Sequence, residues 1–298
     1  MLRGLYTATA GMISQQRKHD TITNNIANMN TPGFKQSRAV SRSFPEMLIG
    51  LMEGKPGMEV ANTGKLNTGV LAEEALTINV QGILRETNNP FDFAVVSDIQ
   101  VPGLQFDAGK TITPEGERIF QPQAFLTVAN EAGEPRYTRN GKFSVTEQGA
   151  LVTAEGFRVL GENGEPIVLL DPATQIPITN ITVNRYGQLL DSTNGQALLD
   201  GAGIPIRMLI SRVDNPIRLI PEGSNLFRLD AADEGAVTQV TAADAVEVKQ
   251  GFVESSNVDP TQAVVDMMSA SRMYEANQKV IQAYDKSMEK AVNEIGRV

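Results

Sequence analysis

The apolar positions near the start of the chain recur every three or four residues, which is the spacing of one helix face. The repeat extends over residues 1–30, where small and polar side chains such as Ala8, Gln15 and His19 interrupt it. Because these residues dilute the apolar stripe, the pattern predicts an N-terminal core helix with a weak seam. The apolar members of the repeat are Leu5, Met12, Ile22, Ile26 and Met29.

A second helical pattern occupies the end of the chain, within residues 251–298. Asp259 can cap this helix, Pro260 suits its first position, and Gln262 follows as in a capping box. Only one stripe is apolar, so the helix needs a partner, and the N-terminal helix is the obvious one. We therefore expect the two ends to pair as a coiled coil. The heptad positions of the stripe are Met267, Ala270, Tyr274, Asn277, Ile281, Tyr284, Met288, Ala291 and Ile295.

The sequence between the two ends changes character twice. Residues 31–75 are interrupted by many Gly and Pro residues, which predicts a linker with loops. Residues 76–250 contain short alternating or β-branched runs, such as 91–96 and 125–130, separated by Asn-Gly and Glu-Gly turn signals. Many short strands with frequent turns predict a central all-β domain, an antiparallel sandwich or a partly open barrel. The expected fold class is therefore α+β.

Side-chain amides crowd the end of the N-terminal helix, in the stretch NNIANMNTPGFK at residues 24–35. Its asparagines can bind backbone groups freed at the helix end, or they can bind a neighbouring subunit. The Pro-Gly pair then ends the helix, and the following phenylalanine can anchor the turn on a partner. The residues of this stretch that we expect at an assembly interface are Asn25, Ile26, Asn28, Met29, Asn30, Gly33 and Phe34.

Charge and hydropathy narrow the function classes. The net charge is −9, which argues against general nucleic-acid binding, because that activity needs a basic face. The first 42 residues carry six basic side chains and one acidic one. This basic arm can pair with the acidic body of a neighbouring copy, or it can be a solvated face.

No apolar run is long enough to span a membrane, and no cleavable secretory signal is evident. We expect a cytoplasmic protein or one exported by another route.

The residue types needed for catalysis are scarce. The chain has no cysteine and one histidine, His19, which excludes thiolate and multi-histidine metal sites. A Ser-His-Asp triad would have to use His19, which lies on the weak helical seam. Residues 103–111 approach a phosphate-binding loop, but five residues separate the glycines where the motif has four. We expect no enzyme activity, metal or cofactor. A carboxylate pair brought together by the fold, as in a glycosidase, stays open at this point.

Three segments of the sequence resemble one family, the bacterial flagellar rod–hook axial proteins. The first segment is a helix followed by Asn-Asn-Ile-Ala-Asn and Asn-Thr-Pro-Gly-Phe-Lys, within residues 5–35. The second, within residues 251–292, has Glu-Ser-Ser-Asn-Val-Asp and then Tyr-Glu-Ala-Asn in a long helix. The third, residues 137–161, is similar to the family's Tyr-Thr-Arg-x-Gly-x-Phe turn and Leu-Val-Thr strand. The resemblance adds to the expected interface Ser256, Asn257, Val258, Asp259, Tyr274, Glu275 and Asn277.

The resemblance implies a function that the residues themselves do not reveal. Members of the family are structural subunits that leave the cell through the flagellar type III apparatus without a cleaved signal. Their terminal helices form the inner tube of a helical assembly, and the β domain forms an outer layer. A single β-rich insert of this size is similar to that of a distal rod subunit. The implied partners are further copies of the chain, other rod and hook subunits and the export machinery, and the implied location is the flagellar basal body.

Two other functions and one departure from the family pattern stay open at this point. The chain can instead be a hook or hook-junction subunit, or, more remotely, a secreted enzyme or surface-binding module on a β scaffold. The departure is an insert at residues 97–122, between runs that follow one another closely in the family. We expect this insert to add a hairpin to the β domain or to form a contact surface specific to this chain.

Overall fold

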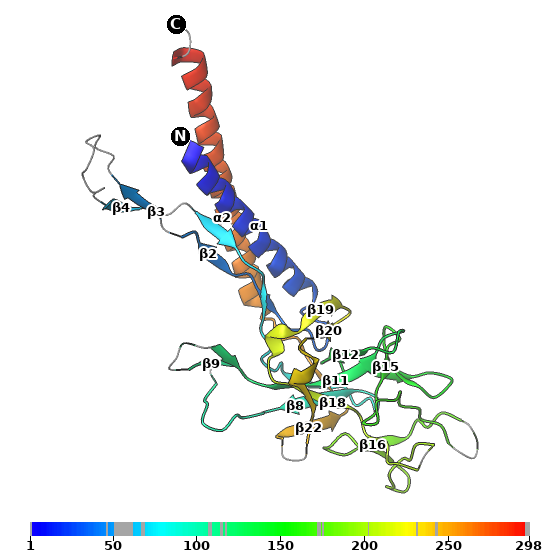
Figure 1. The fold of residues 1–298 in the computed structure, drawn as a ribbon. Helices are drawn as coiled ribbons and strands as arrows, with labels where there is room; N and C mark the ends of the chain where they lie inside the picture. The colour runs from blue at the N-terminus through cyan, green and yellow to red at the C-terminus, as the bar shows by residue number, and fades with distance from the viewer. Residues whose placement is uncertain are drawn as a thin grey trace. The chain divides into compact units, whose positions relative to one another are not determined.

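A computed structural model describes the chain over residues 2–45, 47–50, 62–66, 69–106, 109–113, 116, 118–171, 174, 176–201, 203–230, 232–241 and 244–295. The chain divides into two compact units (Figure 1). The first, the helical unit, contains Met1–Ala27, Ser37–Thr77 and Val258–Val298. The second, the body, contains Asn28–Gln36 and Ile78–Asn257.

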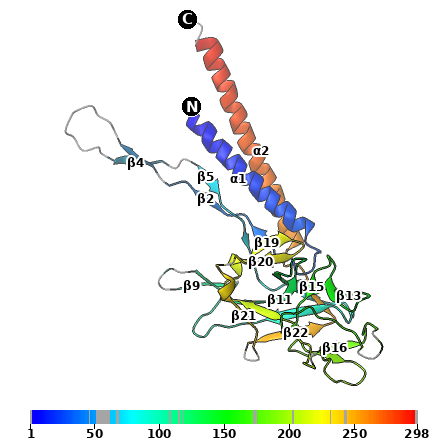
Figure 2. The same cartoon turned by 45° about the vertical axis from the view of Figure 1, so that its right-hand side comes forward.

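Two long helices dominate the helical unit. Helix α1 spans Leu2–Ala27, and helix α2 spans Pro260–Lys290 and continues as a π-helical turn, η3, over Ala291–Ile295. The helices contact each other and run antiparallel, so that both chain ends lie at the same end of the pair (Figures 1 and 2). The helices expected at the two ends of the chain are therefore present and packed together.

The start of α2 follows from its first residues. The Asp259 side chain accepts hydrogen bonds from the backbone N–H groups of Thr261 and Gln262, at 2.8 and 3.2 Å. This satisfies two of the N–H groups that a helix N-terminus leaves without intrahelical partners. The Gln262 amide donates to Asp266 at 3.0 Å, one turn further on. The predicted cap by Asp259 is confirmed, whereas the bond from Gln262 to Asp266 is a different one from the backward bond of a capping box.

The two helices pack through small residues on α1. A Cβ atom added at Gly4 would lie 2.1 Å from the Tyr284 hydroxyl oxygen, and one added at Gly11 would lie 3.1 Å from the Asn277 amide nitrogen. Both α2 residues belong to the predicted heptad stripe, and Ala270 of that stripe is fully buried. The glycines of α1 therefore let the larger side chains of α2 approach its backbone.

A long antiparallel ribbon completes the helical unit. It lies in residues 31–75 and just beyond, the stretch in which the sequence predicts a linker. The ribbon is bonded to α1, because the Arg17 guanidinium donates to the Ala72 carbonyl at 3.1 Å. The paired strands of the ribbon are β1 (Ser37–Arg38) with β6 (Leu76–Thr77), β2 (Ser41–Ser43) with β5 (Val70–Ala72), and β3 (Met47–Gly50) with β4 (Asn62–Leu66).

The body is built on an antiparallel sheet of nine strands, arranged in the order β13-β14-β15-β11-β12-β20-β19, with β18 pairing to β11 and β21 to β18. The described strands form no closed barrel. The nine strands are β11 (Gln123–Ala129), β12 (Pro135–Thr138), β13 (Phe143–Val145), β14 (Leu151–Thr153), β15 (Arg158–Val159), β18 (Ile210–Val213), β19 (Ile220–Gly223), β20 (Leu226–Arg228) and β21 (Val237–Gln239).

Four further strand pairs surround this sheet, and all of them are antiparallel. They are β7 (Leu84–Glu86) with β23 (Phe252–Glu254), β8 (Phe93–Ser97) with β22 (Val246–Gln250), β9 (Lys110–Ile112) with β10 (Arg118–Phe120), and β16 (Ile181–Val183) with β17 (Leu189–Asp191). Short 3-10 helices η1 and η2 cover Pro216–Arg218 and Glu234–Ala236. The pair β9–β10 confirms the hairpin expected in the insert at residues 97–122.

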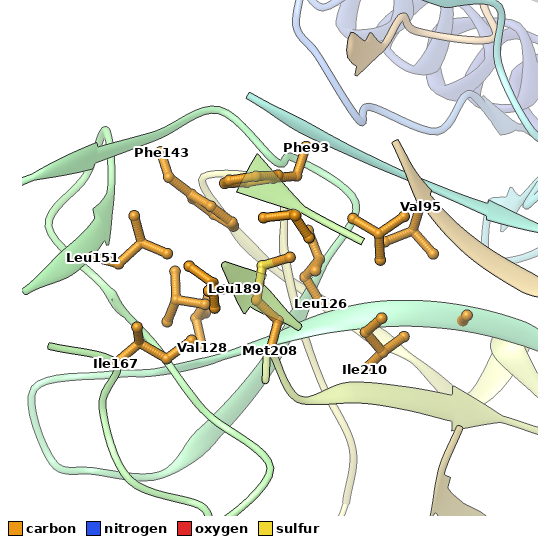
Figure 3. Close-up of a cluster of buried hydrophobic side chains, with 14 of the residues drawn as sticks. Phe93, Val95, Leu126, Val128, Phe143, Leu151, Ile167, Leu189, Met208 and Ile210 are labelled. Atoms are coloured by element: carbon orange, nitrogen blue, oxygen red, sulfur yellow. The ribbon is translucent and has the colours of Figure 1, made fainter. Parts of the chain in front are cut away.

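The core of the body lies between the main sheet and the strands beside it (Figure 3). The rings of Phe93 from β8 and Phe143 from β13 pack at a tilt of 42° with their centroids 6.0 Å apart, and Leu126 and Val128 of β11 are fully buried beside them. Every residue of β11 is buried, so this strand forms the centre of the body. The predicted α+β class, with antiparallel strands, is confirmed. None of the described helices is long and apolar enough to cross a membrane.

Candidate functional site

The chain passes between its two units four times, and the body residues beside these crossings are tied together. The Gly33 N–H donates to the Glu254 carbonyl at 2.8 Å. The Gln36 N–H donates to the Asn257 side-chain oxygen at 2.7 Å, and the Asn257 amide donates to the Ile78 carbonyl at 2.8 Å. Segments that are distant in the sequence thus meet at one place in the body.

Beneath these backbone ties lies a buried ion cluster that we call the junction cluster: Lys35, Arg139 and Glu254, with Ser97 and Gln123. The Lys35 ammonium lies 2.5 Å from the Glu254 carboxylate and 2.8 Å from the Val80 carbonyl. The same carboxylate oxygen accepts a hydrogen bond from the Gly82 N–H at 2.8 Å. The Lys35 and Glu254 side chains are 1% and 0% exposed, so water does not screen this pair.

Arg139 approaches the second carboxylate oxygen and binds three neutral acceptors. Its guanidinium donates to the Val95 carbonyl at 2.7 Å, to the Ser97 hydroxyl at 2.9 Å and to the Gln123 side-chain oxygen at 2.6 Å. It lies 3.5 Å from Glu254 Oε2 and stacks over the Phe125 ring at 5.4 Å. One buried carboxylate thus faces two cations, and the neutral oxygens stabilise the surplus positive charge.

The protonation states follow from burial and from these neighbours. Burial, and then repulsion by Arg139, lowers the pKa of Lys35 to about 8, although Glu254 opposes the shift. Burial acts to raise the pKa of Glu254, but the charges of Arg139 and Lys35 outweigh it, and the net pKa is lowered. The carboxylate therefore stays ionised at neutral pH, and Lys35 stays mostly protonated. Each ionised group has a partner, which limits the desolvation cost of burying it.

Gly33 shows why this local sequence is needed. Its φ is +72°, in the left-handed region that favours glycine, and a Cβ atom there would lie 2.5 Å from the backbone of Arg139 and Asn140. Only a residue without a side chain allows the chain to pass this close to the turn that carries Arg139. The backbone bond from Gly33 to Glu254 then places Lys35, two residues later, beside its carboxylate.

The cluster has no features of a catalytic site. Its carboxylate is completely buried and is surrounded by cations and donors, so no substrate can reach it. Among the described residues, no group of three or more His, Cys, Asp or Glu side chains could hold a metal. A cavity of about 410 Å³ elsewhere in the body is lined by Glu162, Glu165, Asp200 and Arg207 without histidine. The arrangement therefore suits a structural joint that holds segments of the chain together.

The predicted amides have specific partners. Asn25 is buried: its side-chain nitrogen donates to the Ser37 carbonyl at 2.7 Å, and its oxygen accepts from the Ser37 N–H at 2.9 Å. The Asn28 oxygen accepts from the Thr31 hydroxyl at 3.3 Å. Asn257 binds within the body as described above. Of the two alternatives for the amides of residues 24–35, Asn25 binds backbone groups of its own chain.

The other predicted interface residues follow the helical pattern, and their role in assembly stays a prediction. His19 is half-buried on α1 beside Asp20. The side chain of Ile295 lies outside the described residues. Ile22, Gly33 and Val258 are buried; Asn30, Asp259, Tyr274 and Glu275 are exposed; half-buried are Leu5, Met12, Ile26, Met29, Phe34, Ser256, Met267, Asn277, Ile281, Tyr284 and Met288.

The three charged residues of the junction cluster were missing from the predicted site. Lys35 and Glu254 are 219 positions apart, and no local pattern links them. The local feature that they share is a glycine two or three positions away, in the segments Gly-Phe-Lys, Thr-Arg-Asn-Gly and Gly-Phe-Val-Glu.

Comparison with known proteins identifies the same three segments. Family models match residues 5–35 (Flagella basal body rod protein), 120–190 (Flagellar hook protein FlgE/F/G D1 domain) and 249–294 (Flagellar basal body rod FlgEFG protein C-terminal). Each matched segment contributes one charged residue to the junction cluster: Lys35, Arg139 and Glu254 respectively. The joint is thus assembled from all three family segments.

Curated relatives match along the whole chain. The flagellar hook-basal body complex protein FlhO of Bacillus subtilis is 37% identical, with 100% of both chains covered. The flagellar basal-body rod protein FlgG of Agrobacterium fabrum is 31% identical over 95% of this chain and 96% of its own. That of Borreliella burgdorferi is 31% identical over 96% of each.

Replacing Gly33 by alanine tests the close approach at the joint. Gly164 has a similar φ of +79° but nothing within 4 Å of an added Cβ, so Gly164→Ala measures backbone strain alone. We expect Gly164→Ala to cost about 1–2 kcal/mol of unfolding free energy. Gly33→Ala should cost about 1–3 kcal/mol more, because the backbone must also move. Urea denaturation followed by circular dichroism measures both; equal losses would contradict the close approach.

The lowered pKa of Glu254 predicts a loss of stability in acid. As pH falls below the ordinary carboxyl value of 4.5, the unfolded chain takes up a proton before the folded chain does. The stabilisation by this group is therefore complete above that pH and is lost as pH falls through the lower, folded pKa. Comparing the parent with the double variant Lys35→Met/Glu254→Gln isolates this contribution from other carboxylates. On acidification the parent should lose unfolding free energy relative to the double variant. A constant difference between the two would contradict the assignment.

Proposed function

This chain belongs to the family of flagellar basal-body rod and hook proteins, and we propose that it is a distal rod subunit that self-assembles helically through its terminal helices. It is a structural protein and not an enzyme. The observation that carries the assembly proposal is the surface of the helical unit. After α1 and α2 have packed together, Tyr6 of α1 is still 71% exposed, and further apolar side chains stay in solvent. These are Ile13, Val264, Val265, Met268, Met273, Val280 and Val292.

An exposed apolar surface of this kind favours contact with other subunits. Apolar side chains on one face of a helix are stabilised by removing them from water, at about 25 cal/mol per Å² buried. Single exposed apolar residues are ordinary, but repeated ones along two adjacent helices indicate an interface. Neighbouring copies supply the missing cover, and a head-to-tail contact that does not close generates a filament. The weak, glycine-containing seam is compatible with this, because assembly adds stability by mass action.

The names of the relatives support the location. Several are called flagellar basal-body rod proteins, and others are called hook-basal body complex proteins. We place the chain in the flagellar basal body, with other rod and hook subunits as partners. We also propose that the chain is exported through the flagellar type III apparatus, as the resemblance to the family implies. Because two relatives are called hook-basal body complex proteins, a hook or hook-junction subunit is the alternative function.

Transmission of torque from the motor to the hook gives the junction cluster a role. A rod subunit must pass rotation between its helices and its body without yielding where the chain crosses between them. The body residues beside the four crossings are held by backbone hydrogen bonds and by a buried carboxylate that faces two cations. Breaking such a pair is strongly unfavourable, which makes the body side of the joint stiff. The family segments thus serve two purposes, assembly and mechanical connection.

A single charge on the exposed apolar face tests assembly. Val265→Asp should abolish or strongly reduce incorporation into rods, because it places a carboxylate in the buried interface between copies. Gln278→Asp is the matched control, since it introduces the same side chain at an exposed polar position of the same helix. The measurement is the amount of chain in hook–basal bodies isolated from producing cells, with circular dichroism to show that both variants fold. If Val265→Asp enters rods as well as the parent does, this face is not the assembly interface.

A further inference from the structure

The body contains an internal repeat. Residues 143–169 and 181–208 share glycine, leucine and Pro-Ile at equivalent positions, with one extra residue in the second copy. Gly149 corresponds to Gly187 and Leu151 to Leu189, and Pro166-Ile167 corresponds to Pro205-Ile206. The second copy therefore repeats the spacing of the first along its whole length.

The hydrogen bonds repeat as well. Leu151 N–H donates to the Ile167 carbonyl at 3.0 Å, and Leu189 N–H donates to the Ile206 carbonyl at 3.0 Å. Four further bonds recur in the same way at equivalent positions. In the first copy they are 149→146, 161→165, 164→161 and 167→159, and in the second they are 187→184, 200→204, 203→200 and 206→198. The two copies are thus the same structural unit, and side chains of both pack into one core (Figure 3).

The copies differ at one edge. In the first copy, the Leu160 N–H donates to the Thr127 carbonyl of β11, and the Leu160 carbonyl accepts from Leu209, at 3.0 and 2.9 Å. Leu160 is 6% exposed. The equivalent residue, Leu199, is 55% exposed, and its N–H and carbonyl have no hydrogen-bond partner among the residues that the structure describes. Residues 197–199 of the second copy bridge Leu190 and Pro205 on their inner side, and their outer backbone edge has no partner in the part of the chain that the structure describes, whereas β11 covers the equivalent edge of the first copy.

A second unpaired edge lies on the insert hairpin. The bond from Gln121 N–H to the Gly109 carbonyl sets the register of β9 on β10, so the backbone groups of Lys110 and Ile112 face away from β10. Within the described part of the chain, β9 pairs with β10 alone, and Ile112 is 66% exposed. An edge with exposed backbone groups and an apolar side chain is a template for pairing with another chain.

We propose that these two edges pair between copies: β9 of one subunit adds as a strand to residues 197–199 of the next. This inference rests on the proposed self-assembly and identifies a contact made by the body in addition to the helices. The repeat indicates that a β-strand binds at this edge, because the equivalent edge of the first copy pairs with the antiparallel strand β11. Thr111 and Ile112 are β-branched and suit that role.

Charge and position support a second copy as the partner. Lys110 and Arg118 are exposed on the hairpin, whereas Asp191 and Asp200 flank the edge at residues 197–199. Within the body, the β9 hairpin and the β16–β17 repeat lie on opposite sides in both views (Figures 1 and 2). The two edges of one copy therefore do not meet each other, and they are placed to pair head to tail with neighbours. Such a contact continues from copy to copy without closing.

Cysteine cross-linking tests this pairing directly, because the chain contains no cysteine. The double variant Ile112→Cys/Leu199→Cys is produced in cells, and isolated hook–basal bodies are treated with a short bis-maleimide. We expect the chain to shift from the monomer band to a ladder of dimers and higher multiples. The matched control is Ile112→Cys/Thr193→Cys, in which the second cysteine lies on an exposed turn away from the edge and should give no ladder.

The outcomes separate this inference from the proposed function. If the double variant is present in the rods but gives no ladder, or if the control gives an equal ladder, the edge pairing is wrong while the rod assignment stands. Cross-linking of the single variant Leu199→Cys to itself would also overturn the head-to-tail arrangement. If neither the parent nor the variants are found in hook–basal bodies, the proposed function fails, and the pairing fails with it.

Discussion

The Glu254 carboxylate, buried between Lys35 and Arg139, is the interaction on which the rest of the structure depends. It contacts Lys35, which follows the end of α1, and Arg139, which lies in the turn after β12, and it belongs to the strand that precedes α2. Removing Glu254 would leave two buried cations without a carboxylate, which costs several kcal/mol. The carboxylate therefore holds together three segments, from the two ends and the middle of the chain.

This arrangement explains how one subunit combines weak helices with a firm body. The α1–α2 pair has glycines and polar residues in its seam and leaves apolar side chains in solvent, so in the proposed assembly it gains stability from neighbours. The body buries a continuous core around β11, and its internal repeat extends that core to a second copy of the same unit. The junction cluster lies on the body side of the crossings, where the proposed transmission of torque requires rigidity. In this account, assembly depends on the helices and on the strand edges, and rigidity depends on the buried ions.

The sequence predicts some parts of this molecule well because their causes are local. Periodicity and the Asp259-Pro260 start are enough to predict α2, and the alternating runs predict antiparallel strands. The sequence predicts a linker over residues 31–75 because the strands there are short and interrupted by Gly and Pro, and their pairing depends on contacts across the ribbon. Lys35, Arg139 and Glu254 were missed for a similar reason, since only the folded chain brings them together. The repeat is hard to see because its copies share mainly turn glycines and a few core residues, whereas its hydrogen bonds make it plain.

The most direct test of this account is a double-mutant cycle at the junction cluster. The unfolding free energies of the parent, Lys35→Met, Glu254→Gln and the double variant would be measured by urea denaturation at neutral pH. We expect Glu254→Gln to destabilise the chain by about 3–5 kcal/mol, because it leaves two buried cations without their carboxylate, and Lys35→Met to cost less, because Arg139 still faces Glu254. The double variant should lose much less than the sum of the two, since contacting residues couple. Additive losses would show that Lys35 and Glu254 act independently, which would contradict the role of the cluster as the joint of the subunit.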